Sequence, residues 1–421
     1  MKKQLAVLVA LILFNASFAQ KNLVPGKPEE NGISSERLQR IDRELNEYIT
    51  KAQIPGVVGF IARNGKIVYQ KSFGFSNVEK KTPLKSDNIF RIASQSKAVT
   101  SLAVMMLWED GKFLLDEPIS KYIPEFKEPK VLVWFNEKDS TYSAQPAKSE
   151  ITIRQLLTHS SGIDYATIGN KEFKAIYAKA GIPSGIGNSK PSDVLSDKIK
   201  KLAKLPLRHQ PGEQWTYGLN TDVLGYLIEV LSGMTFDDYL REKIFKPLGM
   251  NDTYFYLPKE KHDRLVTLYE TKDGKLSQPT SIYDGMNPEY PKLNGKYYSG
   301  GAGLCSTVED YAKFLQLFLN KGEYNGTRLL SRKTVELILT DQLQPPLKES
   351  FGLGFGLETA DNDYQSPLSL GSFSWGGAFN THYWADPKEK LIGIIFTNMY
   401  NSPHWNIGER YKALVYQSII D

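Results

Sequence analysis

The sequence of 421 residues contains one cysteine and five histidines. A single cysteine, Cys305, cannot form an internal disulfide bond or a thiolate metal cluster, and we interpret it as a small buried apolar side chain. No two histidines stand at a ligand spacing such as H-x-x-x-H. We therefore expect no metal site, and we expect no other cofactor.

Three further features are scarce. The sequence has no G-x-S-x-G motif, which disfavours an α/β-hydrolase. After the N-terminal segment no apolar run is long enough to span a membrane. The formal net charge is only +5, and such a small excess on a long chain predicts no nucleic-acid partner.

The N-terminal segment has the layout of a secretory signal peptide. Lys2 and Lys3 precede an apolar run from Leu5 to Phe14, and Ser17-Phe18-Ala19 fits a small-x-small cleavage site. We predict a signal peptide over residues 1–19, a mature chain that starts near Gln20, and a periplasmic or secreted location. An N-terminal anchor that stays attached is the alternative.

Strand and hairpin signals lie towards both ends of the chain. Two β-rich runs joined by Asn64-Gly65 predict a hairpin over residues 57–70, because both turn residues tolerate a positive φ angle. A second hairpin is predicted from residues 381–385 and 391–398. Helices are predicted over about 36–52, capped by Ser34 or Ser35, and over about 407–419.

The middle of the chain, by contrast, shows mostly helices and long loops. The pattern predicts an α+β fold in which an antiparallel sheet, formed from both ends of the chain and flanked by the terminal helices, carries a large, mainly helical insertion. We predict one domain over residues 20–421. Its sheet part covers about 30–93 and 292–421, and its helical part about 94–291.

Candidate catalytic residues begin with Ser94 and Lys97. Ser94 is the only serine in the sequence with a lysine three residues later, and the almost wholly apolar run 98–108 follows directly. A helix that is apolar on all sides is a central one, so the first turn would hold Ser94 with Lys97 on the same face. A serine hydroxyl needs a base, and a buried lysine can act as a neutral amine.

Two more segments add to this pattern. Tyr217 lies in Pro211-Gly-Glu-Gln-Trp-Thr-Tyr-Gly-Leu-Asn220, on a loop before the apolar helix expected over 223–231. Trp375, Gly376 and Gly377 lie in Phe373-Ser-Trp-Gly-Gly-Ala378, which we expect at the start of a late strand. Glycines in a strand let a substrate or another backbone approach closely.

In this order and spacing, the three segments resemble the β-lactamase and penicillin-binding serine hydrolases, especially class C β-lactamases and family VIII carboxylesterases. The resemblance runs from about Glu36 to Asn398. Ser94-x-x-Lys97 resembles the nucleophile motif, Tyr217 the tyrosine of the second motif, and Trp375-Gly376-Gly377 the W-G-G that esterase members carry where β-lactamases have K-T-G. The stretches 115–122, 156–162 and 300–304 also resemble the family.

The resemblance implies acyl transfer in two steps. Ser94 would attack a carbonyl carbon while Lys97 and Tyr217 share its proton, and the backbone N–H groups of Ser94 and Ala378 would bind the oxyanion. Which of Lys97 and Tyr217 is the resting base stays open, because a coupled pair titrates together. His159 is expected to be structural.

Substrate contacts are expected from Trp375, Gly376, Gly377 and Asn220. Penicillin-active members usually place asparagine at the position of Leu219, and Asn220 stands one residue late. Trp375 replaces the lysine that helps to hold the carboxylate of a β-lactam.

These departures favour a carboxylesterase that acts on small esters. Two alternatives remain: a β-lactamase or D-amino-acid peptidase or carboxypeptidase acting on β-lactams or cell-wall peptides, and a slowly acylating binder or sensor. The expected partner is therefore a small-molecule ester or amide.

Overall fold

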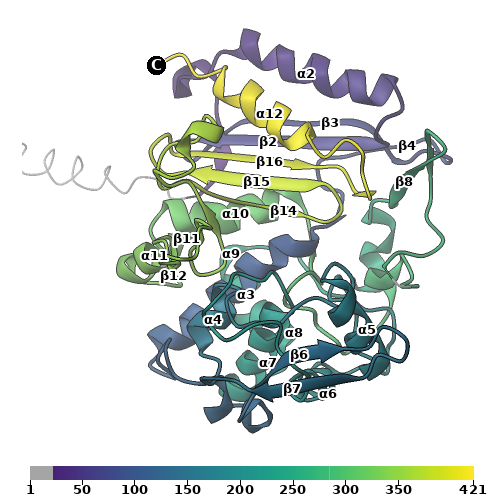
Figure 1. The fold of residues 1–421 in the computed structure, drawn as a ribbon. Coiled ribbons are helices and arrows are strands. Elements are labelled where there is room, and N and C mark those ends of the chain that lie inside the picture. Colours follow the sequence, from purple (N-terminus) through teal and green to yellow (C-terminus); the bar gives the residue numbers. More distant parts are fainter. Residues whose placement is uncertain (1–21, 284) are drawn as a thin grey trace, which may run out of the picture.

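The computed structural model describes residues 22–283 and 285–421, so the predicted signal peptide and its cleavage site lie outside the described residues. A large sheet with helices on both faces lies next to a mainly helical part (Figure 1). The earliest described elements and the last strands and helix of the chain belong to the sheet side, as the α+β prediction required.

The main sheet has the strand order β1-β3-β2-β16-β15-β14-β13, with β4 paired to β3. All neighbouring strands are antiparallel except β1 and β3, which run parallel. The strand bounds are β1 Val24–Pro25, β2 Gly56–Arg63, β3 Lys66–Asn77, β4 Thr82–Pro83, β13 Gly356–Leu357, β14 Phe373–Gly377, β15 Thr381–Asp386 and β16 Leu391–Phe396.

Both predicted hairpins are present. β2 and β3 are joined by Asn64 and Gly65, whose φ angles are +55° and +73°, the values that the hairpin turn requires. The second hairpin is β15–β16. Its strand β16 pairs with β2, which joins the two ends of the chain at the centre of the sheet.

Helices cover both faces of this sheet. On one face α2 (Ser35–Thr50) and α12 (Ile407–Tyr416) pack against each other, and on the other lies α10 (Val308–Leu319). Alternate residues of β2 point to opposite faces of the sheet. Val57 and Ile61 belong to the core under α2 and α12, whereas Val58 and Phe60 belong to the core that includes α10. This alternation follows from the period of two in a strand.

The helix α2 forms where its cap and apolar spacing predicted. Ser34 accepts a hydrogen bond from the backbone N–H of Arg37, which satisfies one of the free donors of the first turn. Leu38, Ile41 and Leu45 are buried as expected, but Tyr48 rather than Ile49 completes the buried face.

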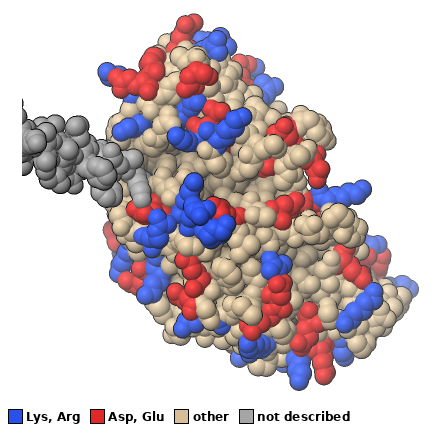
Figure 2. Space-filling view, turned by 90° about the vertical axis from the view of Figure 1, so that its left-hand side faces the viewer, with Lys and Arg blue, Asp and Glu red and all other residues tan. Residues whose placement is uncertain are grey.

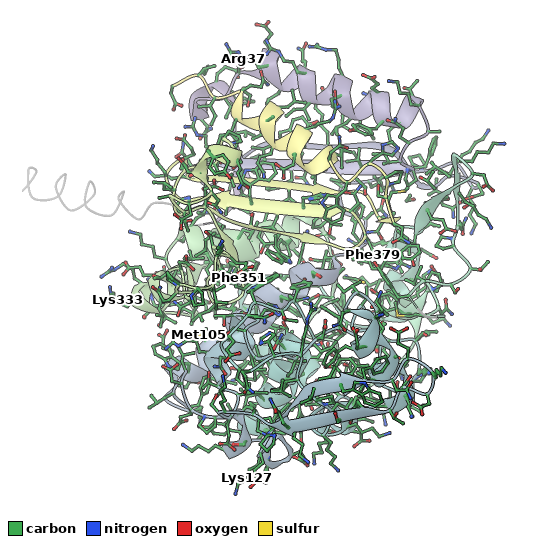
Figure 3. All side chains as sticks on the ribbon, in the orientation of Figure 1. Arg37, Met105, Lys127, Lys333, Phe351 and Phe379 are labelled. Carbon is green, nitrogen blue, oxygen red and sulfur yellow. The ribbon has the colours of Figure 1, made fainter. Side chains whose placement is uncertain are left out.

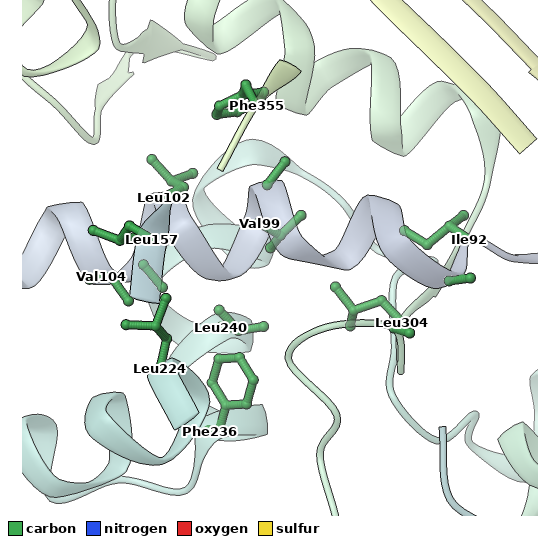
Figure 4. Close-up of a cluster of buried hydrophobic side chains, with 14 of the residues drawn as sticks. Ile92, Val99, Leu102, Val104, Leu157, Leu224, Phe236, Leu240, Leu304 and Phe355 are labelled. Carbon is green, nitrogen blue, oxygen red and sulfur yellow. The ribbon is translucent and has the colours of Figure 1, made fainter. Parts of the chain in front are cut away.

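The helical part is built around α3 (Ser96–Glu109), which is buried on nearly all sides, as its apolar run predicted. Figure 4 shows Val99, Leu102 and Val104 of α3 among apolar side chains of neighbouring elements, including Leu224 of α7. The remaining helices are α4 Ile153–Leu157, α5 Lys171–Ala180, α6 Leu195–Leu202, α7 Asn220–Ser232, α8 Phe236–Leu240, α9 Lys246–Leu248 and α11 Arg332–Ile338.

Small strands occur outside the main sheet. Two hairpins lie in the segment that the sequence predicted as helices and loops, β6–β7 and β8–β9. Val133 and Trp134 of β6 are largely exposed, so this hairpin lacks the buried alternation by which a strand is recognised. The bounds are β5 Phe90–Arg91, β6 Lys130–Phe135, β7 Tyr142–Pro146, β8 Tyr269–Lys272, β9 Lys275–Ser277, β10 Cys305–Ser306, β11 Glu323–Tyr324, β12 Thr327–Arg328 and β17 Met399–Tyr400.

The surface carries both signs of charge. Figure 2 shows Lys and Arg interspersed with Asp and Glu on one face, with a gathering of Lys and Arg near its middle. Among residues 22–283 and 285–421, no helix is long and apolar enough to cross a membrane. The same residues contain no group of three or more His, Cys, Asp or Glu side chains placed to hold a metal ion.

Candidate active site

Ser94 lies where the helical part meets the sheet. It belongs to a short 3₁₀ turn, Ala93–Gln95, that leads directly into α3, so it precedes the first turn of the α-helix in which it was predicted. The strand β14 packs against this turn. A Cβ atom on Gly377 would stand only 2.2 Å from the carbonyl oxygen of Ile92, so this close approach requires glycine.

Lys97 points back at Ser94 from the first turn of α3. Its Nζ lies 3.3 Å from Ser94 Oγ, 2.8 Å from the hydroxyl of Tyr165 and 2.7 Å from the carbonyl oxygen of Gly301. The side chain is buried. An ammonium group would donate three hydrogen bonds here, whereas a neutral amine would accept the proton of Ser94 on its lone pair. The geometry therefore suits a base for Ser94.

Tyr217 is the third predicted group, and its ring lies beside Lys97. Lys97 Nζ is 4.5 Å from the centroid of the ring, within the range of a cation–π contact. The hydroxyl oxygen of Tyr217 accepts a hydrogen bond from Nε1 of Trp375 at 3.2 Å. An indole N–H can only donate, so the proton of the phenol is left free to point elsewhere. The structure thus brings Ser94, Lys97, Tyr217 and Trp375 together.

Trp375, from which the sequence predicted a substrate contact, also donates a hydrogen bond to Tyr217. Its ring is half-buried on β14 and packs edge-on against Phe351, with centroids 5.3 Å apart. Trp215 stacks on Tyr217 with centroids 5.8 Å apart and an interplanar angle of 20°. We call Trp215, Tyr217, Phe351 and Trp375 the aromatic wall. Figure 3 places Phe351 where the sheet meets the helical part.

His159 holds the loop of Tyr217 in place. Its Nδ1 accepts hydrogen bonds from the backbone N–H of Gly218 at 3.4 Å and from the Asn220 amide at 2.9 Å. Burial, with the positive charge of Lys97, lowers the pKa of His159 well below its usual value, so the ring is neutral and can accept. This geometry matches the expected structural role.

Asn220 has a different place from the one predicted. It was expected to bind substrate, but its side chain is 0 % exposed. Its Oδ1 accepts a hydrogen bond from the Ser161 hydroxyl, and its Nδ2 reaches His159. Because both ends of the amide are engaged inside the protein, the side chain positions the Tyr217 loop rather than lining the cleft. The sequence pattern gave its nearness to Tyr217 but not its direction.

Gly376, Gly377 and Ala378 follow Trp375 along the sheet edge nearest to Ser94. Gly376 and Ala378 are half-buried, and Gly377 is buried. Ala378 directly follows β14, so its backbone lies beside the Ser94 turn that this strand contacts. The oxyanion roles of the Ser94 and Ala378 N–H groups, and the substrate contacts of Gly376 and Gly377, stay predictions.

Sequence reasoning missed Tyr165, whose hydroxyl oxygen accepts a hydrogen bond from Lys97. Its hydroxyl contacts Lys97, yet the two residues are 68 positions apart, and no motif marks Tyr165. Burial raises the pKa of Tyr165 well above its usual value, so it is a neutral phenol. A neutral phenol supports Lys97 without adding a charge.

Comparison with known proteins identifies the family of the chain. The sequence model of the Beta-lactamase family matches residues 40–417. Protein Rv1367c of Mycobacterium tuberculosis (strain H37Rv) is 32% identical over 363 residues, which is 83% of this chain and 86% of that protein. Esterase EstB of Burkholderia gladioli is 28% identical over 378 residues, 85% of this chain and 90% of that protein.

Solved structures show the same fold. The simvastatin synthase LovD of Aspergillus terreus superposes with a TM-score of 0.77 and 26% identity, covering 91% of this chain and 98% of that one. EstCE1, described as a hydrolase with promiscuous acyltransferase activity, has a TM-score of 0.77 and 24% identity, covering 90% and 98%. With Ser94 and Lys97 placed as they are, the protein is a serine hydrolase that belongs to the β-lactamase family.

Proposed function

We propose that this protein is a carboxylesterase that hydrolyses small esters through an acyl-enzyme on Ser94. The observation that carries the proposal is the place of Trp375. The resemblance of Trp375-Gly376-Gly377 to the W-G-G motif implies that Trp375 stands where β-lactamases of the family have a lysine, and its N–H is directed at the oxygen of Tyr217. The cation that would hold the carboxylate of a β-lactam is therefore replaced by an aromatic ring.

The difference in binding is large enough to matter. A charge-assisted hydrogen bond is worth about 1.5–3 kcal/mol, or roughly 10–150-fold in affinity. A neutral ester has no carboxylate to be held, so it loses nothing when the lysine is absent. The aromatic wall offers it apolar contact area instead. This balance favours neutral esters over β-lactams.

The proposed reaction uses Ser94, Lys97 and Tyr217. Ser94 Oγ forms a bond to the ester carbon while its proton passes to Lys97 or Tyr217. The tetrahedral intermediate then expels the alcohol, which takes a proton from Tyr217, and leaves an acyl group on Ser94. Water attacks this acyl group and gives its proton to the same pair, and Ser94 departs with a proton restored.

Two relatives support the ester chemistry by their names. One is the esterase EstB, and another is the monacolin J acid methylbutanoyltransferase of Aspergillus terreus, which is 28% identical over 403 residues. Both activities are compatible with one acyl-enzyme and differ in the acceptor, water or an alcohol. An alcohol added to the assay tests for acyl transfer by this protein.

A side-by-side assay tests the proposal. Turnover of p-nitrophenyl esters of increasing acyl length is compared with turnover of a chromogenic cephalosporin, with Ser94→Ala as the control for uncatalysed hydrolysis. We expect the ester to be preferred in kcat/KM. A preference for the cephalosporin would favour the β-lactamase or peptidase alternative. A stable acyl adduct in intact-mass spectra, without turnover, would favour the slowly acylating binder.

We also propose that the protein is exported. The support is the pattern of residues 1–19 described above. The test is the N-terminal sequence of the protein recovered from the periplasm or the medium of cells that express the full chain. We expect it to start near Gln20. Full-length protein in the membrane fraction would instead favour the retained anchor.

A further inference from the structure

Asp222 is a buried carboxylate that the mechanism above does not use. It stands in the first turn of α7, and its side chain is 0 % exposed. Its oxygens accept hydrogen bonds from the hydroxyl of Tyr297 at 2.7 Å, the hydroxyl of Ser299 at 3.1 Å and the backbone N–H of Gly301 at 2.8 Å. All three donors are neutral groups. The negative charge of this carboxylate therefore has no direct ion-pair partner among these contacts.

Gly301 links Asp222 to Lys97. Its N–H donates to Asp222, and its carbonyl oxygen accepts from Lys97 Nζ at 2.7 Å, so one peptide segment contacts both charged groups. A Cβ atom on Gly301 would lie 3.4 Å from Asp222 Oδ1 and also 3.4 Å from Lys97 Nζ. The two charged atoms are therefore at most twice that distance apart, in a region closed to solvent.

A protonated Lys97 requires a nearby negative charge, and the Asp222 carboxylate can supply it. When Lys97 takes the proton of Ser94 it becomes a buried cation, and the two groups besides Ser94 that accept its hydrogen bonds, Tyr165 and Gly301, are neutral. Burial disfavours such a cation unless an opposite charge is near. A directly paired carboxylate would hold the lysine permanently protonated, whereas one separated by Gly301 stabilises the cation without occupying its hydrogen bonds.

We propose that Asp222 is the counter-charge of Lys97, a positioning residue that acts through Gly301 and sets how readily Lys97 takes up the proton of Ser94. The positive charge of Lys97 in turn favours the ionised form of Asp222 and opposes the effect of burial, which raises the pKa of the Asp222 carboxyl. The inference rests on Ser94 and Lys97 as a nucleophile and its base. It does not depend on the preference for esters.

The experiment is a pH–rate profile of the Asp222→Asn variant. The rate measured is the labelling of Ser94 by a fluorophosphonate, which reports the nucleophile even if no ester is turned over. Without the carboxylate the cationic form of Lys97 is less favourable. The acidic limb of the pH–rate profile, where the rate rises as the base loses its proton, therefore moves to lower pH. The expected shift is about one to two pH units, from the charge separation and an effective dielectric constant near 20.

The direction of this shift does not depend on where the resting proton lies. The acidic limb reports the loss of the first proton from the fully protonated pair of Lys97 and Tyr217. Removing a negative charge destabilises that most positive form in either case. We also expect the plateau rate to fall several-fold, because the lysine becomes a weaker base.

A matched control separates this role from a structural one. Asp386 is also 0 % exposed and accepts hydrogen bonds from Tyr416 and from backbone N–H groups, but it lies in β15 on the sheet side. Asp386→Asn should lower the melting temperature and leave the acidic limb in place. An unshifted limb in folded Asp222→Asn, or an equal shift in Asp386→Asn, would overturn the proposal.

A second pair of variants keeps the proposal testable if Asp222→Asn does not fold. Tyr297→Phe removes one donor to the carboxylate and so weakens its ionised form, which predicts a smaller shift of the acidic limb in the same direction. Asp222→Glu keeps the charge and should restore most of the wild-type profile. A wild-type profile in Tyr297→Phe, with Asp222→Asn unfolded, would contradict the proposal.

Discussion

The helical wall and the sheet wall of the active site carry side chains of different chemistry. The wall on the helical side holds Lys97, which is buried and bonded to Tyr165 and Gly301. The wall on the sheet side presents Trp375, a half-buried ring that packs against Phe351. The first environment suits the movement of a proton, and the second suits contact with a neutral substrate. The difference implies that reactivity and specificity can be changed separately.

The helical wall should dominate the rate. Ser94→Ala removes the nucleophile, so we expect kcat to fall by a factor on the order of 10³ or more, with the melting temperature nearly unchanged. The check is steady-state kinetics together with a thermal melt. A covalent inhibitor that labels a different serine would contradict the assignment of Ser94.

Tyr217 belongs to the aromatic wall and also lies beside Lys97, so its substitution should show both effects. Tyr217→Phe keeps the ring that faces Lys97 but removes the hydroxyl that Trp375 contacts. We expect a loss in kcat on the order of 10²–10⁴, with KM for an ester nearly unchanged. If the phenylalanine variant keeps most of its activity, another group transfers the proton, and the catalytic role assigned to Tyr217 is wrong.

The sheet wall should control the choice of substrate. Trp375→Lys restores a cation, so the ratio of β-lactam to ester turnover should rise by at most roughly 10–150-fold, the worth of one charge-assisted contact of about 1.5–3 kcal/mol. Ester turnover should fall, because a cation replaces apolar surface. The ratio is measured with the two chromogenic substrates on the same preparation. An unchanged ratio in a folded, reactive variant would mean that position 375 does not contact substrate.

Trp375→Phe separates the contribution of the apolar ring at position 375 from that of the indole N–H. It keeps an apolar ring on the wall but removes the N–H that donates to Tyr217. The net worth of such a bond is about 0.5–1.5 kcal/mol, so we expect a two- to tenfold loss in kcat and little change in the substrate ratio. A large change in the ratio would instead assign the specificity to the indole N–H.

Acid stability tests the sheet side alone. Burial lowers the pKa of His382 in β15 from 6.5 to about 4, so the unfolded chain binds a proton there before the folded one does. The contribution of His382 to the free energy of unfolding is therefore fully present above pH 6.5. It decreases as the pH drops towards 4, by up to about 1.4 kcal/mol per pH unit. His382→Gln should flatten the fall in melting temperature over this range. An equally steep fall in the variant would assign the acid sensitivity to other groups.

The sequence predicted best what depends on neighbouring residues. The β2–β3 hairpin follows from Asn64-Gly65, the cap of α2 from Ser34, and the pairing of Ser94 with Lys97 from one helical turn. Each of these signals acts within a few residues. Local physics is enough for such elements.

What the sequence could not predict depends on distant contacts. The carbonyl oxygen that holds Lys97 belongs to Gly301, 204 positions along the chain, and Trp375 reaches Tyr217 across 158 positions. The contacts of the Asn220 side chain could not be predicted for the same reason, because His159 and Ser161 are brought to it only by folding. No short sequence pattern encodes contacts between residues so far apart in the chain.

The pairing of β2 with β16 has a consequence for how the chain folds. Arg63 at the end of β2 donates to the carbonyl oxygen of Glu389, 326 positions later, and the central strands of the sheet face each other across a similar interval. Closing so long a loop costs entropy before any contact is gained, and chains rich in distant contacts fold slowly. During synthesis β2 therefore has no partner on that side until β16 has been made. The edge of β2 in a growing chain therefore remains unpaired on that side for most of its synthesis, and it is accessible to chaperones throughout that time.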